Sequence, residues 1–69
     1  MTPSQQARVA PTHEDVGKYV RTPHGDGTLL GVRSTPGRTR YARLMMAVVR
    51  MDRGEVESFY VDNVEVIGD

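Results

Sequence analysis

The side chains that could carry acid–base or nucleophilic chemistry are few and widely spaced in this chain. The two histidines are His13, close to the N-terminus, and His24, within a Pro- and Gly-rich turn. Neither has a partner at a spacing that would orient it as a general base or a metal ligand, so we interpret both as solvated polar residues. Ser58 has acidic neighbours but no candidate base. We therefore expect no catalytic residues, no metal, no cofactor and no enzymatic activity.

Two other patterns resemble reactive sites only in outline. Gly25-Asp26-Gly27 is followed by an expected strand, whereas a glycine loop that cradles phosphate opens a helix. Glu55 and Glu57 share one face of a later strand, but no apolar neighbour would raise the pKa of either carboxyl group. We interpret the two glutamates as a solvated face that discourages edge-to-edge aggregation.

Charge is unevenly distributed along the sequence. Nine basic and nine acidic residues give a formal net charge of zero. The segment from Lys18 to Arg53, however, contains eight basic residues and only two acidic ones, whereas all five charged residues from Gly54 to Asp69 are acidic. This predicts a molecule with a basic and an acidic side. The alternative is that the acidic strand lies beside the basic ones, so that the charges neutralise each other across the sheet.

Arginine dominates the basic segment, and its planar guanidinium suits the recognition of phosphate or carboxylate. One hypothesis is that these arginines grip a DNA or RNA backbone while a tyrosine stacks on a base. The candidate nucleic-acid-binding residues are Arg21, Arg33, Arg38, Arg40, Tyr41 and Arg43. The competing interpretation is a solvated basic loop.

A second hypothesis is docking on a protein partner, with aromatic side chains as anchors. The candidate protein-binding residues are Tyr19, Arg50 and Tyr60. Phe59 is a further aromatic, but a domain this small needs it in the core. Salt dependence separates the two hypotheses, because phosphate contacts weaken steeply with ionic strength and an apolar protein interface does not.

The length of 69 residues allows one domain with a marginal core. The absence of cysteine excludes disulfides and thiolate metal sites and fits a reducing compartment. The longest apolar run, Leu44–Val49, is too short to span a bilayer, and Met1–Gln6 lacks the features of a signal peptide. We expect a cytoplasmic protein with no membrane partner; its oligomeric state is left open.

The chain divides into a predicted disordered arm, residues 1–14, and a small β domain, residues 15–69. Pro23, Gly25 and Gly27 mark a hairpin turn. Gly31 suggests a bend where another backbone comes close. The expected elements are strands at 16–22, 28–33, 41–51, 56–60 and 64–67, a basic loop at 34–40, a turn at 52–54 and a 3₁₀ turn at 61–63.

The segment 41–51 contains good helix formers, so a helix is the alternative there. We predict a strand because Ala47, Val49 and Met51 alternate with polar or exposed positions, and because Val48-Val49 is β-branched. These three residues should point inward and Arg50 toward solvent. The rest of the predicted core comprises Val20, Leu30, Phe59 and Val64.

Three segments, Val20–Thr28, Val48–Gly54 and Asn63–Ile67, resemble the "V-x-H-P-x-x-G-x-G-x-V", "V-x-F-x-D-G" and "N-L-x-x-I" segments of one bacterial module. This is the SH3-like or Tudor-like domain of CarD, of transcription-repair coupling factor and of the PcrA and UvrD helicase tails. The resemblance implies an all-β, five-stranded SH3-like barrel after a disordered N-terminal arm. It also implies a transcription or DNA-processing adaptor that docks on a protein, such as the RNA polymerase β subunit, through an exposed strand edge. Thr22 and Met51 depart from the pattern, where the family has histidine and an aromatic residue.

Two alternatives remain. Val56–Tyr60 is similar in outline to the pore strand of type II dihydrofolate reductase, another short SH3-like barrel, although Glu57 stands where that family relies on glutamine. A phage-encoded protein-binding inhibitor is also consistent with so short a module.

Overall fold

The computed structural model describes residues 8–68, and this part of the chain is all-β, with no α-helix. The strands are β1 (Arg8–Val9), β2 (Tyr19–Thr22), β3 (Gly25–Pro36), β4 (Arg43–Met51), β5 (Val56–Tyr60) and β6 (Glu65–Val66). Single 3₁₀ turns, η2 (His13–Asp15) and η3 (Val61–Asn63), precede β2 and β6. The all-β prediction is therefore confirmed.

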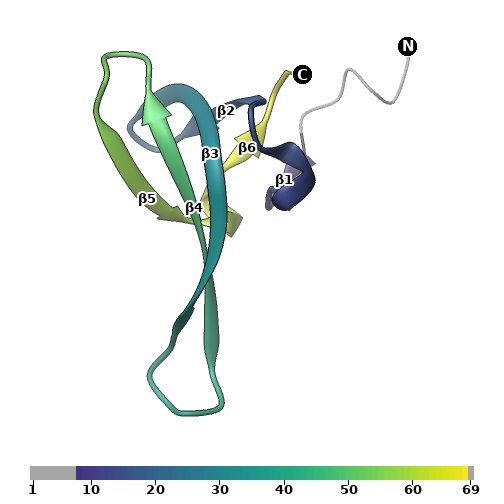
Figure 1. The fold of residues 1–69 in the computed structure, drawn as a ribbon, viewed down its shortest axis with the longest axis vertical. Coiled ribbons are helices and arrows are strands. Elements are labelled where there is room, and N and C mark those ends of the chain that lie inside the picture. Colours follow the sequence, from purple (N-terminus) through teal and green to yellow (C-terminus); the bar gives the residue numbers. More distant parts are fainter. Residues whose placement is uncertain (1–7, 69) are drawn as a thin grey trace.

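All six strands belong to one antiparallel sheet in the order β1-β6-β2-β3-β4-β5, and Figure 1 shows how it curls. β1 and β5 are the two edges, and no pairing joins them within residues 8–68. The sheet is therefore not the closed five-stranded barrel predicted from the sequence. It has a sixth strand because Arg8 and Val9 pair with Val66 and Glu65 of β6.

The core lies on the inner face of the sheet. Its buried side chains are Val20, Leu29, Val32, Ala47, Val49, Met51, Phe59, Val64 and Val66. Ala47, Val49 and Met51 point inward and Arg50 is exposed, as the alternation along β4 predicts. The strand interpretation of this segment is confirmed and the helical alternative is wrong.

A β-bulge in β3 overturns one core prediction. Leu29 pairs with Val49, but Gly31, not Leu30, pairs with Val48, so the bulge places one extra residue in β3. Leu29 and Val32 both reach the core as a result, while Leu30 remains 43% exposed. The sequence prediction of an inward Leu30 is wrong because simple alternation assumes an uninterrupted ladder.

The close backbone approach predicted at Gly31 occurs instead at Gly27. A Cβ atom at Gly31 would meet nothing within 4 Å, whereas one at Gly27 would lie 2.3 Å from the carbonyl oxygen of Arg50. Gly27 pairs with Met51 at the end of β4. Only glycine therefore fits at position 27, whereas Gly31 lies at the bulge of β3.

The N-terminal segment, which the sequence assigns to a disordered arm, contains β1 and the start of η2 within residues 8–14, and residues 1–7 lie outside the described part of the chain. Asp15, 1% exposed, accepts hydrogen bonds from the backbone N–H of Thr12 (2.8 Å) and from Lys18 Nζ (3.2 Å). Arg8 Nη1 donates to the same carboxylate at 3.2 Å. These contacts give the buried carboxylate the hydrogen-bond partners that burial requires.

The most distinctive feature of the shape is the β3–β4 hairpin. β5 pairs with β4 only from Met46 to Arg50, and β2 pairs with β3 only from Gly25 to Thr28. Beyond these residues β3 and β4 continue alone, and Figure 1 shows them projecting from the sheet as a twisted ribbon. The predicted loop at 34–40 is thus partly strand, since β3 extends to Pro36 and the loop spans residues 37–42.

Candidate nucleic-acid interface

The projecting ribbon carries an uncompensated positive charge. We call residues 33–46 the basic hairpin: it contains four arginines, Arg33, Arg38, Arg40 and Arg43, and no acidic residue. All four are exposed. In the described part of the chain none of them forms an ion pair. The hairpin therefore presents its guanidinium groups to solvent, where they can meet an anionic ligand.

The tip of the hairpin is closed by the chain's own backbone. The N–H of Gly37 donates to the carbonyl of Ala42 (2.9 Å), and the N–H of Ala42 donates to the carbonyl of Thr39 (3.1 Å). Between these anchors Arg38, Arg40 and Tyr41 are exposed, and Tyr41 is 87% exposed. An aromatic ring this exposed contributes little to the core.

The two arginines on the stem of the hairpin lie on opposite faces. Arg33 pairs with Met46, which faces outward, whereas Arg43 pairs with Pro36 on the other face of the ribbon. The Nε of Arg43 donates to Ser34 Oγ at 3.1 Å, which holds Arg43 over the inner face. An anion can therefore be contacted from either side of the ribbon.

Arg21, which the sequence grouped with these arginines, lies elsewhere. It is on β2, where Nε lies 3.7 Å from Asp26 Oδ1 and Nη1 lies 3.8 Å from Glu65 Oε1. Its charge is balanced on both sides by neighbouring strands. The structure thus brings together five of the six predicted residues and separates the sixth.

The charges of the sheet body and those of the basic hairpin have different surroundings. Several acids of the sheet body are paired with nearby cations, as Asp26 and Glu65 are with Arg21. Glu55 and Glu57 are paired with Arg53, not with the hairpin. Opposite charges therefore meet at these places in the body of the sheet, whereas the arginines of the basic hairpin have no acidic partner among the described residues.

The predicted protein-binding residues lie on the outer face of the sheet, on three different strands. Tyr19 pairs with Thr28 of β3, and Thr28 pairs with Arg50 of β4. The Tyr19 hydroxyl donates to Asp52, and this bond raises the pKa of the phenol to about 12. Tyr60 lies farther along β5, opposite Met46. Arg50 is exposed and has no ion-pair partner in the described residues.

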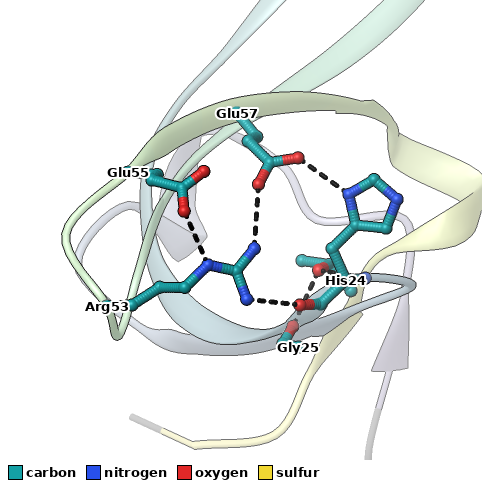
Figure 2. Close-up of polar contacts among 6 residues, drawn as sticks. His24, Gly25, Arg53, Glu55 and Glu57 are labelled. Carbon is teal, nitrogen blue, oxygen red and sulfur yellow. Dashed lines mark hydrogen bonds and ion pairs between the residues drawn. The ribbon is translucent and has the colours of Figure 1, made fainter.

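A polar cluster that the sequence does not reveal joins two turns to β5 (Figure 2). His24 Nδ1 lies 2.8 Å from Glu57 Oε1. Arg53 donates from Nη2 to Glu57 Oε2 (3.3 Å), from Nε to Glu55 Oε1 (2.8 Å) and from Nη1 to the carbonyl of His24 (3.3 Å). The bond to His24 and the charge of Arg53 lower the pKa of Glu57.

The cluster contains a histidine and a carboxylate, as an acid–base pair does, but its contacts are those of a structural link. We call the contact between His24 and Glu57 the clamp. The His24 ring packs edge-on against Phe59, with centroids 5.4 Å apart and planes at 77°. Among the described residues no hydroxyl or thiol hydrogen-bonds to the His24 ring or to the Glu57 carboxylate, and the Thr22 hydroxyl accepts only from the backbone N–H of His24 (3.1 Å). His24 is exposed, as expected of a solvated residue, but its ring contacts Glu57, and the Glu57 side chain is only 25% exposed and not part of a fully solvated face. The two residues are 33 positions apart, so no local spacing could signal their contact.

Within residues 8–68 no group of three or more His, Cys, Asp or Glu side chains could hold a metal ion. The described residues also contain no helix long and apolar enough to cross a membrane. Comparison of the chain with protein-family models, with characterised proteins and with solved structures finds no match. The functional assignment therefore depends on the residues and the geometry of the basic hairpin alone.

Proposed function

We propose that this protein is a non-enzymatic binding module of the transcription or DNA-processing machinery that contacts nucleic acid through the basic hairpin. The observation that carries the proposal is the four exposed arginines on a projecting ribbon, none of them ion-paired in the described residues. A polyanion that approaches this ribbon releases its condensed counterions without breaking any ion pair of the protein. Binding therefore costs little local rearrangement.

The arrangement of the arginines favours phosphate over an isolated carboxylate. Arg38 and Arg40 flank the tip, while Arg33 and Arg43 lie on opposite faces of the stem. One carboxylate can satisfy one guanidinium fork, whereas a nucleic-acid backbone presents a row of phosphates that can meet several. A two-stranded ribbon is also narrow enough to approach a groove or a single strand closely.

The body of the sheet is proposed to dock on a protein, in keeping with its resemblance to the SH3-like modules of CarD and transcription-repair coupling factor. Two features support this. The order of the last elements, a strand, a 3₁₀ turn and a short strand, is that of an SH3-like barrel. β5 is an edge strand whose second row of backbone groups is not paired with any other described strand, so a partner strand can add to it. The RNA polymerase β subunit is the candidate partner that the resemblance suggests.

The proposed nucleic-acid binding is tested by fluorescence anisotropy of labelled DNA and RNA oligonucleotides over a range of salt concentrations. In the parent, affinity should fall steeply as salt rises. Replacing Arg38, Arg40 and Arg43 together by Ala should weaken binding and flatten the slope of log K against log salt by roughly one unit for each phosphate that the variant no longer neutralises. Folding should be unchanged, because these side chains are exposed.

The matched control compares two single variants that each remove one cation. Arg40→Ala should reduce the salt slope, whereas Arg21→Ala, which removes an arginine already paired with Asp26 and Glu65, should not. If the triple variant binds as the parent does, or if the parent binds neither DNA nor RNA at low salt, the basic hairpin is not a nucleic-acid site. Protein docking would then stand alone as the proposed function.

A further inference from the structure

A shallow groove crosses the outer face of the sheet where the basic hairpin joins the body. It is lined by Arg33, Thr35, Leu44, Met46, Ser58 and Tyr60. Arg33 and Tyr60 both pair with Met46, one from β3 and one from β5, so the three residues form a row across three strands. The groove thus joins a residue predicted to bind nucleic acid to one predicted to bind protein.

The lining of this groove has three chemical parts. Tyr60 and Leu44 supply an aromatic ring and an apolar floor, and they are 51% and 37% exposed. Ser58 and Thr35 add hydroxyl groups that can donate or accept hydrogen bonds. Arg33 adds a positive charge that has no ion-pair partner in the described residues, and no acidic side chain lines the groove.

We propose that this groove takes one unpaired base of a single-stranded nucleic acid, which stacks on Tyr60 while Arg33 pairs with an adjoining phosphate. The inference rests on the proposed function of the basic hairpin and narrows its ligand to single strands. A nucleotide combines a flat ring, polar ring edges and an anionic phosphate, and the groove offers a counterpart for each. An aliphatic peptide would leave Arg33 without a partner.

Single strands are favoured over duplexes because the faces of paired bases are covered by their neighbours in the stack. A tyrosine on a sheet surface can reach a base face only when that base is unpaired. Tyr41, at the tip of the same hairpin, offers a second exposed ring. A single strand that follows the outer face of the hairpin from its tip to its base therefore meets the arginines of the tip first and then Arg33 beside Tyr60.

The test uses the full chain and three labelled probes of equal length: oligothymidylate, oligouridylate and a DNA duplex. The parent should bind the single strands more tightly than the duplex. Tyr60→Ala should weaken single-strand binding by about tenfold, the effect of removing one base-stacking ring, whereas Tyr60→Phe should bind as the parent does. Because the chain contains no tryptophan, quenching of tyrosine fluorescence by the unlabelled strand is a second readout, and Tyr60→Ala should reduce it.

The matched control for the charge is Arg50, an arginine of β4 that has no ion-pair partner within residues 8–68 and lies on the same face but outside the groove lining. Arg33→Ala should lower the salt slope by roughly one unit and Arg50→Ala should leave it unchanged. Tyr60→Leu keeps an apolar side chain at the sheet edge without a ring. If it weakens single-strand binding as Tyr60→Ala does, the weakening comes from the missing ring and not from unfolding.

Three results separate this inference from the proposed function. If single strands bind and the hairpin triple variant weakens them, but Tyr60→Ala does not, the groove is not the base site and the hairpin function survives. If the duplex binds at least as tightly as the single strands, the inference is also wrong. If the parent binds no probe at low salt, the proposed function itself fails.

Discussion

His24 and Glu57, 33 positions apart in the chain, are joined by a 2.8 Å contact between the imidazole Nδ1 and a carboxylate oxygen. The contact links the turn between β2 and β3 to the edge strand β5 (Figure 2). It also places the histidine ring against the edge of the core at Phe59. This pair fastens the free edge strand to a turn with which β5 shares no backbone pairing.

We expect the clamp to make stability depend on pH in the acid range. The pKa of Glu57 is lowered in the folded protein, so its contribution to stability is present above the unfolded carboxyl pKa of about 4.3 and is lost as pH falls through the folded value. Urea denaturation from neutral to acid pH should show this loss in the parent. Glu57→Gln should be less stable at neutral pH and should depend less on pH.

A double-mutant cycle isolates the coupling within the clamp. His24→Ala and Glu57→Gln should each lower the urea midpoint, and the two changes together should cost less than the sum of the single effects. Glu55→Gln is the control, because Glu55 contacts Arg53 in the cluster and not His24. Its effect on the urea midpoint should add to that of His24→Ala without coupling. Strictly additive effects of His24→Ala and Glu57→Gln would show that the contact contributes nothing to stability.

Asp15 should be the most important ionised residue for the stability of the N-terminal segment. Arg8, by hydrogen bonding, holds the pKa of this buried carboxyl group well below its usual range, and Thr12 and Lys18 add to the effect. Asp15→Ala removes the carboxylate that Arg8 and Lys18 share, and we expect a loss of about 3 kcal/mol in the free energy of unfolding. The stabilisation should be complete above about pH 4 and should fall only in stronger acid.

Glu14→Gln is the matched control for Asp15, because Glu14 is the adjacent acid, is exposed and has no ion-pair partner in residues 8–68. Its stability should equal that of the parent. Hydrogen exchange provides a local readout: in Asp15→Ala the N–H of Ala10, which donates to the carbonyl of Val64 at 3.1 Å, should lose protection. Equal protection in both proteins would contradict the role given to Asp15.

The bulge in β3 predicts unequal effects of two neighbouring leucines. Leu29 is fully buried and Leu30 is 43% exposed. Leu29→Ala should therefore cost about 3 kcal/mol, enough to unfold much of a domain this small, whereas Leu30→Ala should cost less than about 1 kcal/mol. Denaturant titration of the two variants measures the difference. The reverse order would mean that β3 pairs with β4 in an unshifted register.

Local patterns predicted several elements well. The bounds of β5 and η3 agree with the sequence prediction, and the alternation of Ala47, Val49 and Met51 correctly identified β4 as a strand. These features depend on residues close together in the chain, since side-chain period and β-branching act over a few positions. The basic character of the hairpin was equally visible, because it depends only on the order of the residues.

Other features depended on contacts that no local pattern specifies. β1 pairs with β6, which is far away in the sequence, and its Arg8 also bonds to Asp15, to which Lys18 bonds as well. Arg33 and Tyr60 line the same groove because both of their strands, β3 and β5, pair with β4 at Met46. Such pairings are decided by the whole sheet, and a prediction built from short segments assigns each residue without its distant neighbour.

The sequence by itself determined the all-β class, the core alternation along β4 and the segregation of positive charge, because composition and period-two patterning already constrain them. Only the tertiary structure decided which charges remain unpaired. Strand order placed Glu65 and Asp26 beside Arg21, and Glu57 beside His24 and Arg53, while the hairpin extended beyond the reach of any acid among the described residues. The physical reason is distance, since an ion pair forms only where the fold brings opposite charges within a few ångströms of each other.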